Sequence, residues 1–74
     1  MNKEEIFDKW LLYEFYLYVL PYMFLYGESY IKDPNKSKWL IWQFNREFER
    51  ISKEEKQRRF NRFYKLLQEV EEDE

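Results

Sequence analysis

The chain has 74 residues and a formal net charge of −2, and it contains neither Cys nor His. These absences exclude disulfides and Cys/His zinc sites, and they leave no histidine that would activate a serine nucleophile. Aromatic residues make up 23% of the chain, Gly occurs once and Pro twice, and this composition favours helices over a sheet. We therefore expect one all-α domain over residues 1–74.

The first predicted helix covers residues 3–20. Asn2 is a suitable N-cap, and Glu5 stands three positions later, as in a capping box. Pro21 lacks a backbone donor and disfavours helical geometry in the preceding residue, so we expect the helix to end or kink there. The residues up to Gly27 then form at most a short helical turn, and residues 27–33 form a connection. Apolar side chains recur at helical spacing along this helix: Ile6, Trp10, Tyr13, Leu17 and Leu20.

Two further helices are predicted, over residues 34–51 and 53–70. Asp33 and Pro34 fit the cap and the first position of the second helix. Ser52 opens a capping box for the third helix, so the two helices are closely joined. A three-helix arrangement, a bent rod, and an open shape covered by a second copy are all compatible with this pattern. The expected inward stripes are Leu40, Phe44, Phe48 and Ile51 on the second helix, and Phe60, Phe63, Tyr64, Leu67 and Val70 on the third.

Apolar surface exceeds what three short helices can cover. Trp39 and Trp42 lie off the apolar stripe of the second helix, and the first helix is apolar on more than one side. Large exposed apolar patches usually mark interaction sites. We therefore expect a homodimer.

No set of residues points to catalysis. The serines have no base partner, the chain has no Gly-rich phosphate loop, and most of its carboxylates stand at helix starts or in the acidic tail of residues 71–74. We expect no enzyme activity, no cofactor and no metal. The 17 residues from Trp10 to Tyr26 are at the short end of a membrane span and include Glu14 and Pro21, which argues against spanning. A third, less favoured alternative is a membrane-surface peptide anchored by this aromatic segment.

Charge is distributed unevenly. Residues 46–65 carry eight basic and four acidic side chains, whereas residues 66–74 carry five acidic side chains and no basic one. A solvated helix face is the usual explanation of such a basic stretch. An alternative function is a helical nucleic-acid-binding regulator that uses the basic side of the third helix: Arg58, Asn61, Arg62 and Lys65. The opposite possibility is that acidic residues enter a basic groove that normally holds nucleic acid.

The opening Met1-Asn2-Lys3-Glu4-Glu5, the aromatic run from Trp10 to Tyr26 and the charged end of the chain resemble the small early proteins of bacteriophages. Such proteins bind a host enzyme and switch it off. In length and style the chain is similar to the sliding-clamp inhibitors of staphylococcal phages. The resemblance implies a host protein partner in the bacterial cytoplasm, namely the ring-shaped clamp of DNA polymerase III, and a block on clamp loading.

One departure affects where a clamp would be bound. Clamp partners often use a Gln-x-x-Leu-x-Phe-like peptide, but the segment from Gln43 to Phe48 has Arg46 where leucine is expected. Acidic residues in the positively charged DNA channel fit better than this segment in the peptide pocket. The candidate partner-binding residues are Glu4, Glu5, Asp8, Trp39, Trp42, Glu69, Glu71 and Glu72.

Overall fold

A computed structural model of the chain describes residues 2–72, with the backbone alone for residues 71 and 72. Its regular structure is entirely helical, as the composition predicted, but it has four helices where three were expected. They are α1 (Lys3–Tyr26), α2 (Glu28–Lys32), α3 (Pro34–Glu49) and α4 (Lys53–Glu72).

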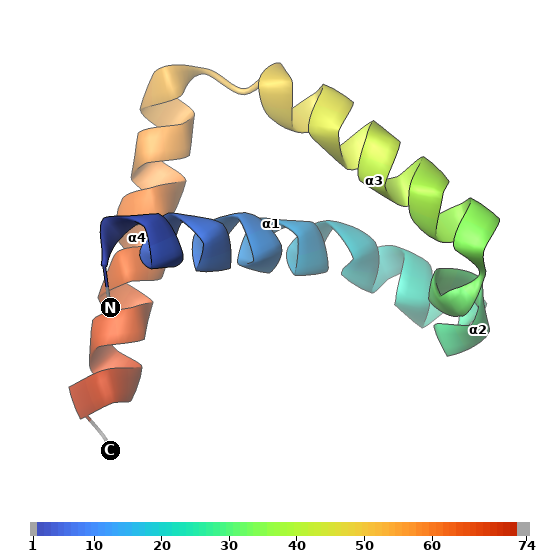
Figure 1. Cartoon of the computed structure of the whole chain (residues 1–74), viewed down its shortest axis with the longest axis horizontal. Coiled ribbons are helices and arrows are strands. Elements are labelled where there is room, and N and C mark those ends of the chain that lie inside the picture. Colours follow the sequence, from blue (N-terminus) through green and yellow to red (C-terminus); the bar gives the residue numbers. More distant parts are fainter. Residues whose placement is uncertain (1, 73–74) are drawn as a thin grey trace.

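Helix α1 does not end at Pro21, so of the two expected outcomes, an end or a kink, the end is wrong. It is 24 residues long and begins at Asn2, whose side chain accepts a hydrogen bond from the Glu5 N–H at 2.9 Å. Pro21 removes only one backbone donor from the helix. Tyr22, one residue later, packs against Tyr30 and Trp39, and these contacts hold the last turn in helical form. The helix continues past Pro21 as one ribbon in Figure 1.

Gly27 ends α1, as predicted. Its φ of 86° and ψ of 172° belong to a region that is almost restricted to glycine, and its N–H donates to the Met23 carbonyl at 2.8 Å. The next five residues form α2 instead of the expected irregular connection. An ion pair between Lys32 and Glu28 at 3.6 Å joins the first and last residues of this short helix.

The starts of α3 and α4 are confirmed, whereas their ends differ from the predictions. The Asp33 side chain accepts from the Asn35 N–H at 2.9 Å, and Ser52 Oγ accepts from the Glu55 N–H at 3.1 Å. Helix α3 ends two residues before the expected residue 51. Helix α4 continues to Glu72, so residues 71 and 72 belong to a helix and not to a separate tail. The predicted tail residues 73 and 74 lie outside the described residues.

The helices form an open triangle (Figure 1). Helices α1 and α3 converge at the corner that contains α2, and α4 crosses the N-terminal half of α1. The backbone of α4 packs against α1 and stays away from that of α3. The arrangement is therefore neither a closed three-helix bundle nor a single bent rod.

Trp10 joins three of the helices. Its ring centroid lies 5.5 Å from that of Phe48 on α3 and 5.4 Å from that of Phe60 on α4. Within residues 2–70 the buried hydrophobic side chains are few: Trp10, Val19, Leu40 and Phe63. Leu17 and Leu20, which belong to the apolar stripe expected on the first helix, are about half exposed because α3 and α4 cover only part of α1.

The open shape leaves much surface uncovered. The radius of gyration is 14.1 Å, whereas a compact domain of this length has a value of about 11 Å. The accessible surface is 6327 Å², whereas a folded monomer of this mass exposes about 5,100 Å². The chain therefore exposes roughly 1,200 Å² more than a compact monomer of the same mass.

Candidate functional site

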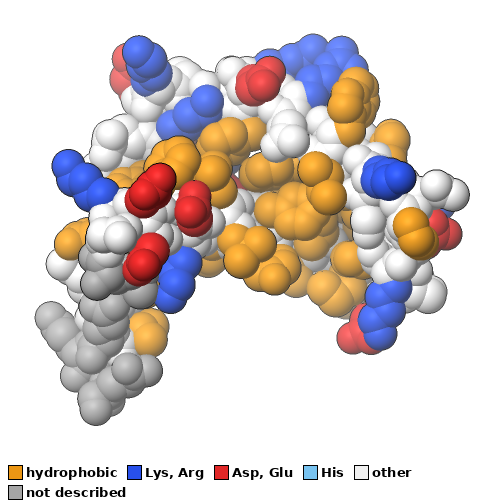
Figure 2. Space-filling view, in the orientation of Figure 1, with side chains coloured by type: hydrophobic (Ala, Val, Ile, Leu, Met, Phe, Trp, Pro, Cys, Tyr) orange, Lys and Arg blue, Asp and Glu red, His pale blue; other side chains and the backbone are white. Residues whose placement is uncertain are grey.

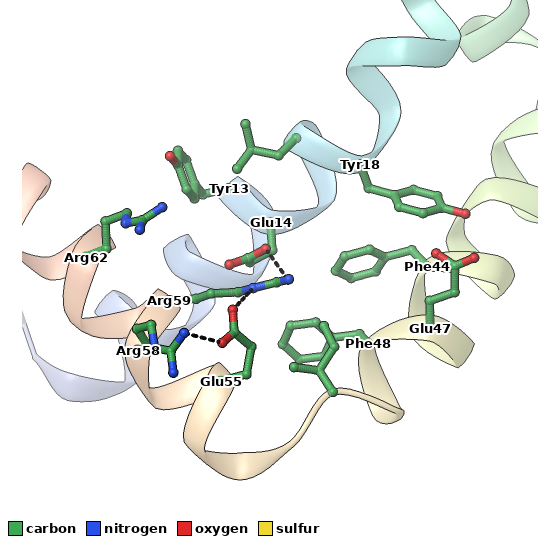
Figure 3. A pocket seen from close by; sticks show the side chains of 12 residues that line it. Tyr13, Glu14, Tyr18, Phe44, Glu47, Phe48, Glu55, Arg58, Arg59 and Arg62 are labelled. Carbon is green, nitrogen blue, oxygen red and sulfur yellow. Dashed lines mark hydrogen bonds and ion pairs between the residues drawn. The ribbon is translucent and has the colours of Figure 1, made fainter.

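A cavity of about 620 Å³ lies where α1, α3 and α4 meet. In Figure 3 the arginines of α4 lie on one side of it, and Tyr18 and Glu47 lie on the other. Its walls combine aromatic rings with charged groups: Tyr13, Glu14, Leu17, Tyr18, Phe44, Glu47, Phe48, Ile51, Glu55, Arg58, Arg59 and Arg62.

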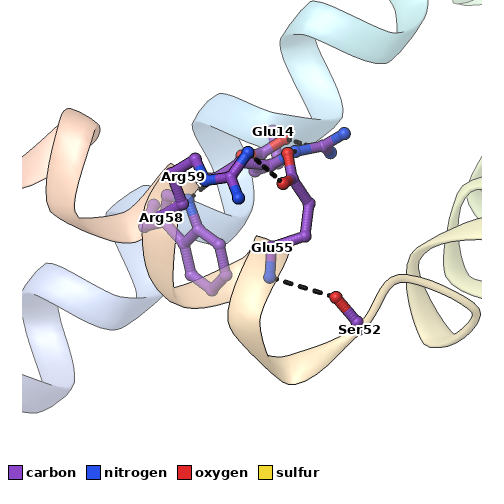
Figure 4. A network of polar contacts seen from close by, with 6 residues as sticks. Glu14, Ser52, Glu55, Arg58 and Arg59 are labelled. Carbon is purple, nitrogen blue, oxygen red and sulfur yellow. Dashed lines mark hydrogen bonds and ion pairs between the residues drawn. The ribbon is translucent and has the colours of Figure 1, made fainter.

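Glu14 is the buried charge of this cavity, with 8% of its surface exposed. The Trp10 indole N–H donates to Glu14 Oε1 at 3.2 Å, and the Arg59 guanidinium lies 3.5 Å from Oε2. Arg59 also donates to Glu55 at 3.2 Å, and Glu55 pairs with Arg58 at 3.1 Å (Figure 4). Both oxygens of Glu14 are therefore engaged, and the network ties α1 to α4.

Tyr18 contributes a buried hydroxyl that has no hydrogen-bond partner in the described part of the chain. Burial raises the pKa of this hydroxyl well above its usual value, and the neighbouring Tyr22 and Glu47 raise it further. The hydroxyl therefore remains protonated at neutral pH. Of the three acids that line the cavity, Glu14 and Glu55 are held in ion pairs with arginines of α4.

The predicted acidic residues of the first helix gather at one end of the molecule. Glu4, Glu5 and Asp8 are all exposed on the first two turns of α1, which we name the acidic turn. Glu4 also lines a groove of about 860 Å³ between α1 and α4, beside Phe7 and Tyr64. The structure thus places an acidic cluster next to exposed aromatic surface.

The acids predicted near the C-terminus are separate from the acidic turn in sequence and lie on α4. Glu69 is exposed. Glu71 and Glu72 continue the same helix, and their side chains lie outside the described residues. Helical order extends further along this acidic segment than the sequence predicted.

Helix α1 carries an exposed apolar ridge on the side away from its partners. The ridge consists of residues spaced four apart, which share one side of a helix. Phe24 is 89% exposed, and the other members are about half exposed. Hydrophobic side chains also gather over the middle of the face in Figure 2. The members of the α1 ridge are Leu12, Tyr16, Leu20 and Phe24.

Trp39 and Trp42 are exposed on α3, at 42% and 58%, as their place off the apolar stripe predicted. Trp39 contacts Tyr22, near the far end of α1 from Glu4. Eighteen helical residues separate Glu4 from Tyr22, which is about 27 Å along the axis. The structure therefore does not bring the tryptophans and the acidic turn together into one site.

The alternative nucleic-acid face is partly neutralised. Arg58 pairs with Glu55, and Asn61 accepts a hydrogen bond from Gln57 at 2.9 Å. Arg62 lines the central cavity, and Lys65 is exposed. The four residues share one side of α4 by helical spacing, but they do not form a uniformly free basic surface.

Sequence reasoning missed the Glu14–Arg59 pair. The available signal was a single acidic residue in an otherwise uncharged run from Trp10 to Tyr26, since a buried charge requires a partner. The identity of that partner depends on the crossing of α1 and α4, which helical periodicity does not encode.

None of the helices in residues 2–72 has the length and apolar character that a membrane span requires. The same residues contain no acidic cluster large enough to hold a metal ion. Comparison with protein-family models, with curated proteins and with solved structures found no match to this chain.

Proposed function

We propose that this chain is a non-enzymatic interaction module of the bacteriophage type, which self-associates and blocks a host DNA-replication protein such as the sliding clamp. It would act in the cytoplasm of the host bacterium. The observation that carries this proposal is the excess of exposed surface over that of a compact monomer of the same mass. A chain whose described residues bury only four hydrophobic side chains gains much from covering such surface.

Self-association fits the size of this excess. A standard protein interface buries about 800 Å² on each partner, and the uncovered excess of roughly 1,200 Å² is large enough for one. The α1 ridge supplies apolar side chains along three turns of helix with no charged residue among its members. We place the interface between two copies on this ridge.

The acidic turn supports docking to a basic partner. Its side chains project from a helix that Asn2 caps, so little backbone conformational entropy is lost when they meet a partner. Charges at the rim of an interface mainly change the association rate and its salt dependence. A positively charged channel built for DNA has the complementary chemistry.

Light scattering tests the first half of the proposal. The full chain should give about twice its 9.6 kDa mass. Tyr16→Glu, which places a charge in the α1 ridge, should return the mass to that of one chain without loss of helicity. A wild-type monomer at high micromolar concentration would contradict self-association.

Association kinetics with a purified bacterial sliding clamp test the second half. The triple variant Glu4→Gln, Glu5→Gln, Asp8→Asn should associate more slowly and with a weaker salt response, with unchanged circular dichroism. A matched triple variant removes exposed acids elsewhere, Glu28→Gln, Glu49→Gln and Glu54→Gln, and should retain most of the association rate. No binding of the wild-type chain to the clamp would refute this partner, and binding unaffected by salt and by the first variant would refute acidic docking.

A further inference from the structure

Two tryptophans of α3 are largely exposed, although Trp39 also contacts Tyr22 of α1 at its edge. Trp39 and Trp42 are three residues apart, so they are neighbours on the helix surface, with their Cβ atoms about 5–6 Å apart. Leu40, Phe44 and Phe48 lie on the opposite side, where Leu40 is fully buried and Phe44 packs against Phe15 and Tyr18. The outer side of α3 therefore presents two indole rings to solvent.

The surroundings of these rings differ from those of the α1 ridge. Apart from the tryptophans themselves, all residues three and four positions from either one are polar or positively charged: Asn35, Lys36, Lys38, Gln43, Asn45 and Arg46. An apolar groove in a protein partner would have to desolvate these groups without pairing them, which is unfavourable. Exposed aromatic rings among amides and cations suit a ligand that offers flat rings and negative charge together.

The two indoles are held in place before any ligand binds. Trp39 contacts the Tyr22 ring edge to face, with centroids 6.1 Å apart and an interplanar angle of 82°. Tyr22 is in turn stacked on Tyr30 at 6.2 Å. The Arg46 guanidinium lies 5.4 Å from the Trp42 ring centroid. Pre-ordered rings lose little side-chain entropy on binding.

The charge of this side is positive although the chain as a whole is negative. Lys36, Lys38, Arg46 and Arg50 are exposed here, and the exposed acids of the C-terminal end of α3 are Glu47 and Glu49. Asp33, at the other end, accepts hydrogen bonds from the Asn35 and Lys36 N–H groups as the helix cap. Glu47 faces the central cavity instead.

We propose that the outer side of α3 binds single-stranded nucleic acid, with Trp39 and Trp42 stacking on successive bases and Lys38, Arg46 and Arg50 contacting the phosphates. Stacking platforms set in a positively charged surface are the usual means of binding single strands without sequence preference. Duplex bases are already stacked and paired, so duplex DNA should bind more weakly. This activity is independent of clamp binding and uses a different surface.

Intrinsic tryptophan fluorescence of the full chain tests the proposal, with oligo(dT) of twelve nucleotides as the probe. Stacking should change the emission of Trp39 and Trp42, whereas Trp10 is 3% exposed and should not respond. The double variant Trp39→Phe, Trp42→Phe should lose the signal. In an anisotropy assay with labelled oligonucleotide, Trp42→Ala should weaken binding by about 5- to 150-fold.

The salt dependence of oligonucleotide binding shows whether the basic residues of α3 or those of α4 contact the phosphates. Lys38→Gln should reduce the slope of log affinity against log salt by about 0.7, the value for one phosphate contact on a single strand. Lys65→Gln, an exposed cation of α4, serves as the control and should leave the slope unchanged. Equal effects of the two variants would place binding elsewhere and overturn the proposal.

Three other results would also overturn it. One is the absence of any fluorescence change with oligo(dT) at low salt. Another is a fluorescence response to phosphatidylglycerol vesicles but not to the oligonucleotide, which would assign this side to an anionic membrane surface. The last is a wild-type chain that forms a dimer and binds no oligonucleotide, together with a Trp42→Ala variant that is monomeric. That result would assign the outer side of α3 to contact with a second copy.

Discussion

Replacing Arg59 with alanine removes the guanidinium that faces the buried carboxylate of Glu14. Removing one partner of a fully buried ion pair destabilises a protein by about 3–5 kcal/mol. The Arg59 side chain is 41% exposed, and the Trp10 indole still donates to Glu14, so the loss must be smaller. We expect Arg59→Ala to lower the free energy of unfolding by about 1–2 kcal/mol, which for a domain of this size lowers Tm by roughly 5–15 °C.

Thermal melts followed by circular dichroism measure this difference. Arg58→Ala is the matched control, because the Arg58 side chain is 71% exposed and pairs with the same Glu55. Arg58→Ala should therefore lower the free energy of unfolding by at most about 1 kcal/mol. In a Glu14→Gln background, which retains an acceptor for Trp10, Arg59→Ala should have little further effect. Equal losses from the two arginine variants, or an unchanged loss in the Glu14→Gln background, would refute the assignment of Glu14–Arg59 as the tie between α1 and α4.

Three further substitutions test the fold, each by its effect on Tm. Phe63→Ala should lower the free energy of unfolding by about 3–5 kcal/mol because Phe63 is buried against Tyr13, whereas the exposed Tyr64→Ala should cost much less; similar losses would mean that the inward side of α4 is misplaced. Pro21→Ala should raise Tm, since it supplies the missing backbone donor within α1 and proline is about 3 kcal/mol less favourable than alanine inside a helix; a lower Tm would show that the ring itself is needed. Gly27→Ala should cost about 1–3 kcal/mol through backbone conformation alone, because nothing lies within 4 Å of the added Cβ, and an unchanged Tm would contradict the glycine requirement.

Features decided by local chemistry were predictable from the sequence. The capping residues Asn2, Asp33 and Ser52 each accept the hydrogen bond that their position implied. Capping depends on residues within one turn, so it can be read without knowledge of the fold. The exposure of Trp39 and Trp42 also followed from their position off a clear apolar stripe.

Features decided by tertiary contacts were not predictable. Pro21 is a strong local signal for the end of a helix, but the packing of Tyr22 against α2 and α3 overrides it. Helix α2 carries no apolar periodicity, and Tyr26 stacks on its Tyr30 across the glycine at 4.9 Å. The same holds for the candidate surfaces. The acidic turn could be predicted from the sequence because its residues are close in the chain, whereas its distance from the tryptophans depends on tertiary structure.

The connections explain why so much of α1 is uncovered. Helix α1 spans about 36 Å by its length in residues, which equals the longest dimension of the molecule at 36 Å. Gly27 and Asp33 are single-residue connections, and they turn α3 back along one side of α1, where its last turn reaches Trp10 through Phe48. Helix α4 crosses the N-terminal half, so no element runs along the outer side of α1. The side of α1 left free by this geometry is apolar, whereas the free side of α3 is polar and basic, and the two sides therefore suit ligands of different chemistry.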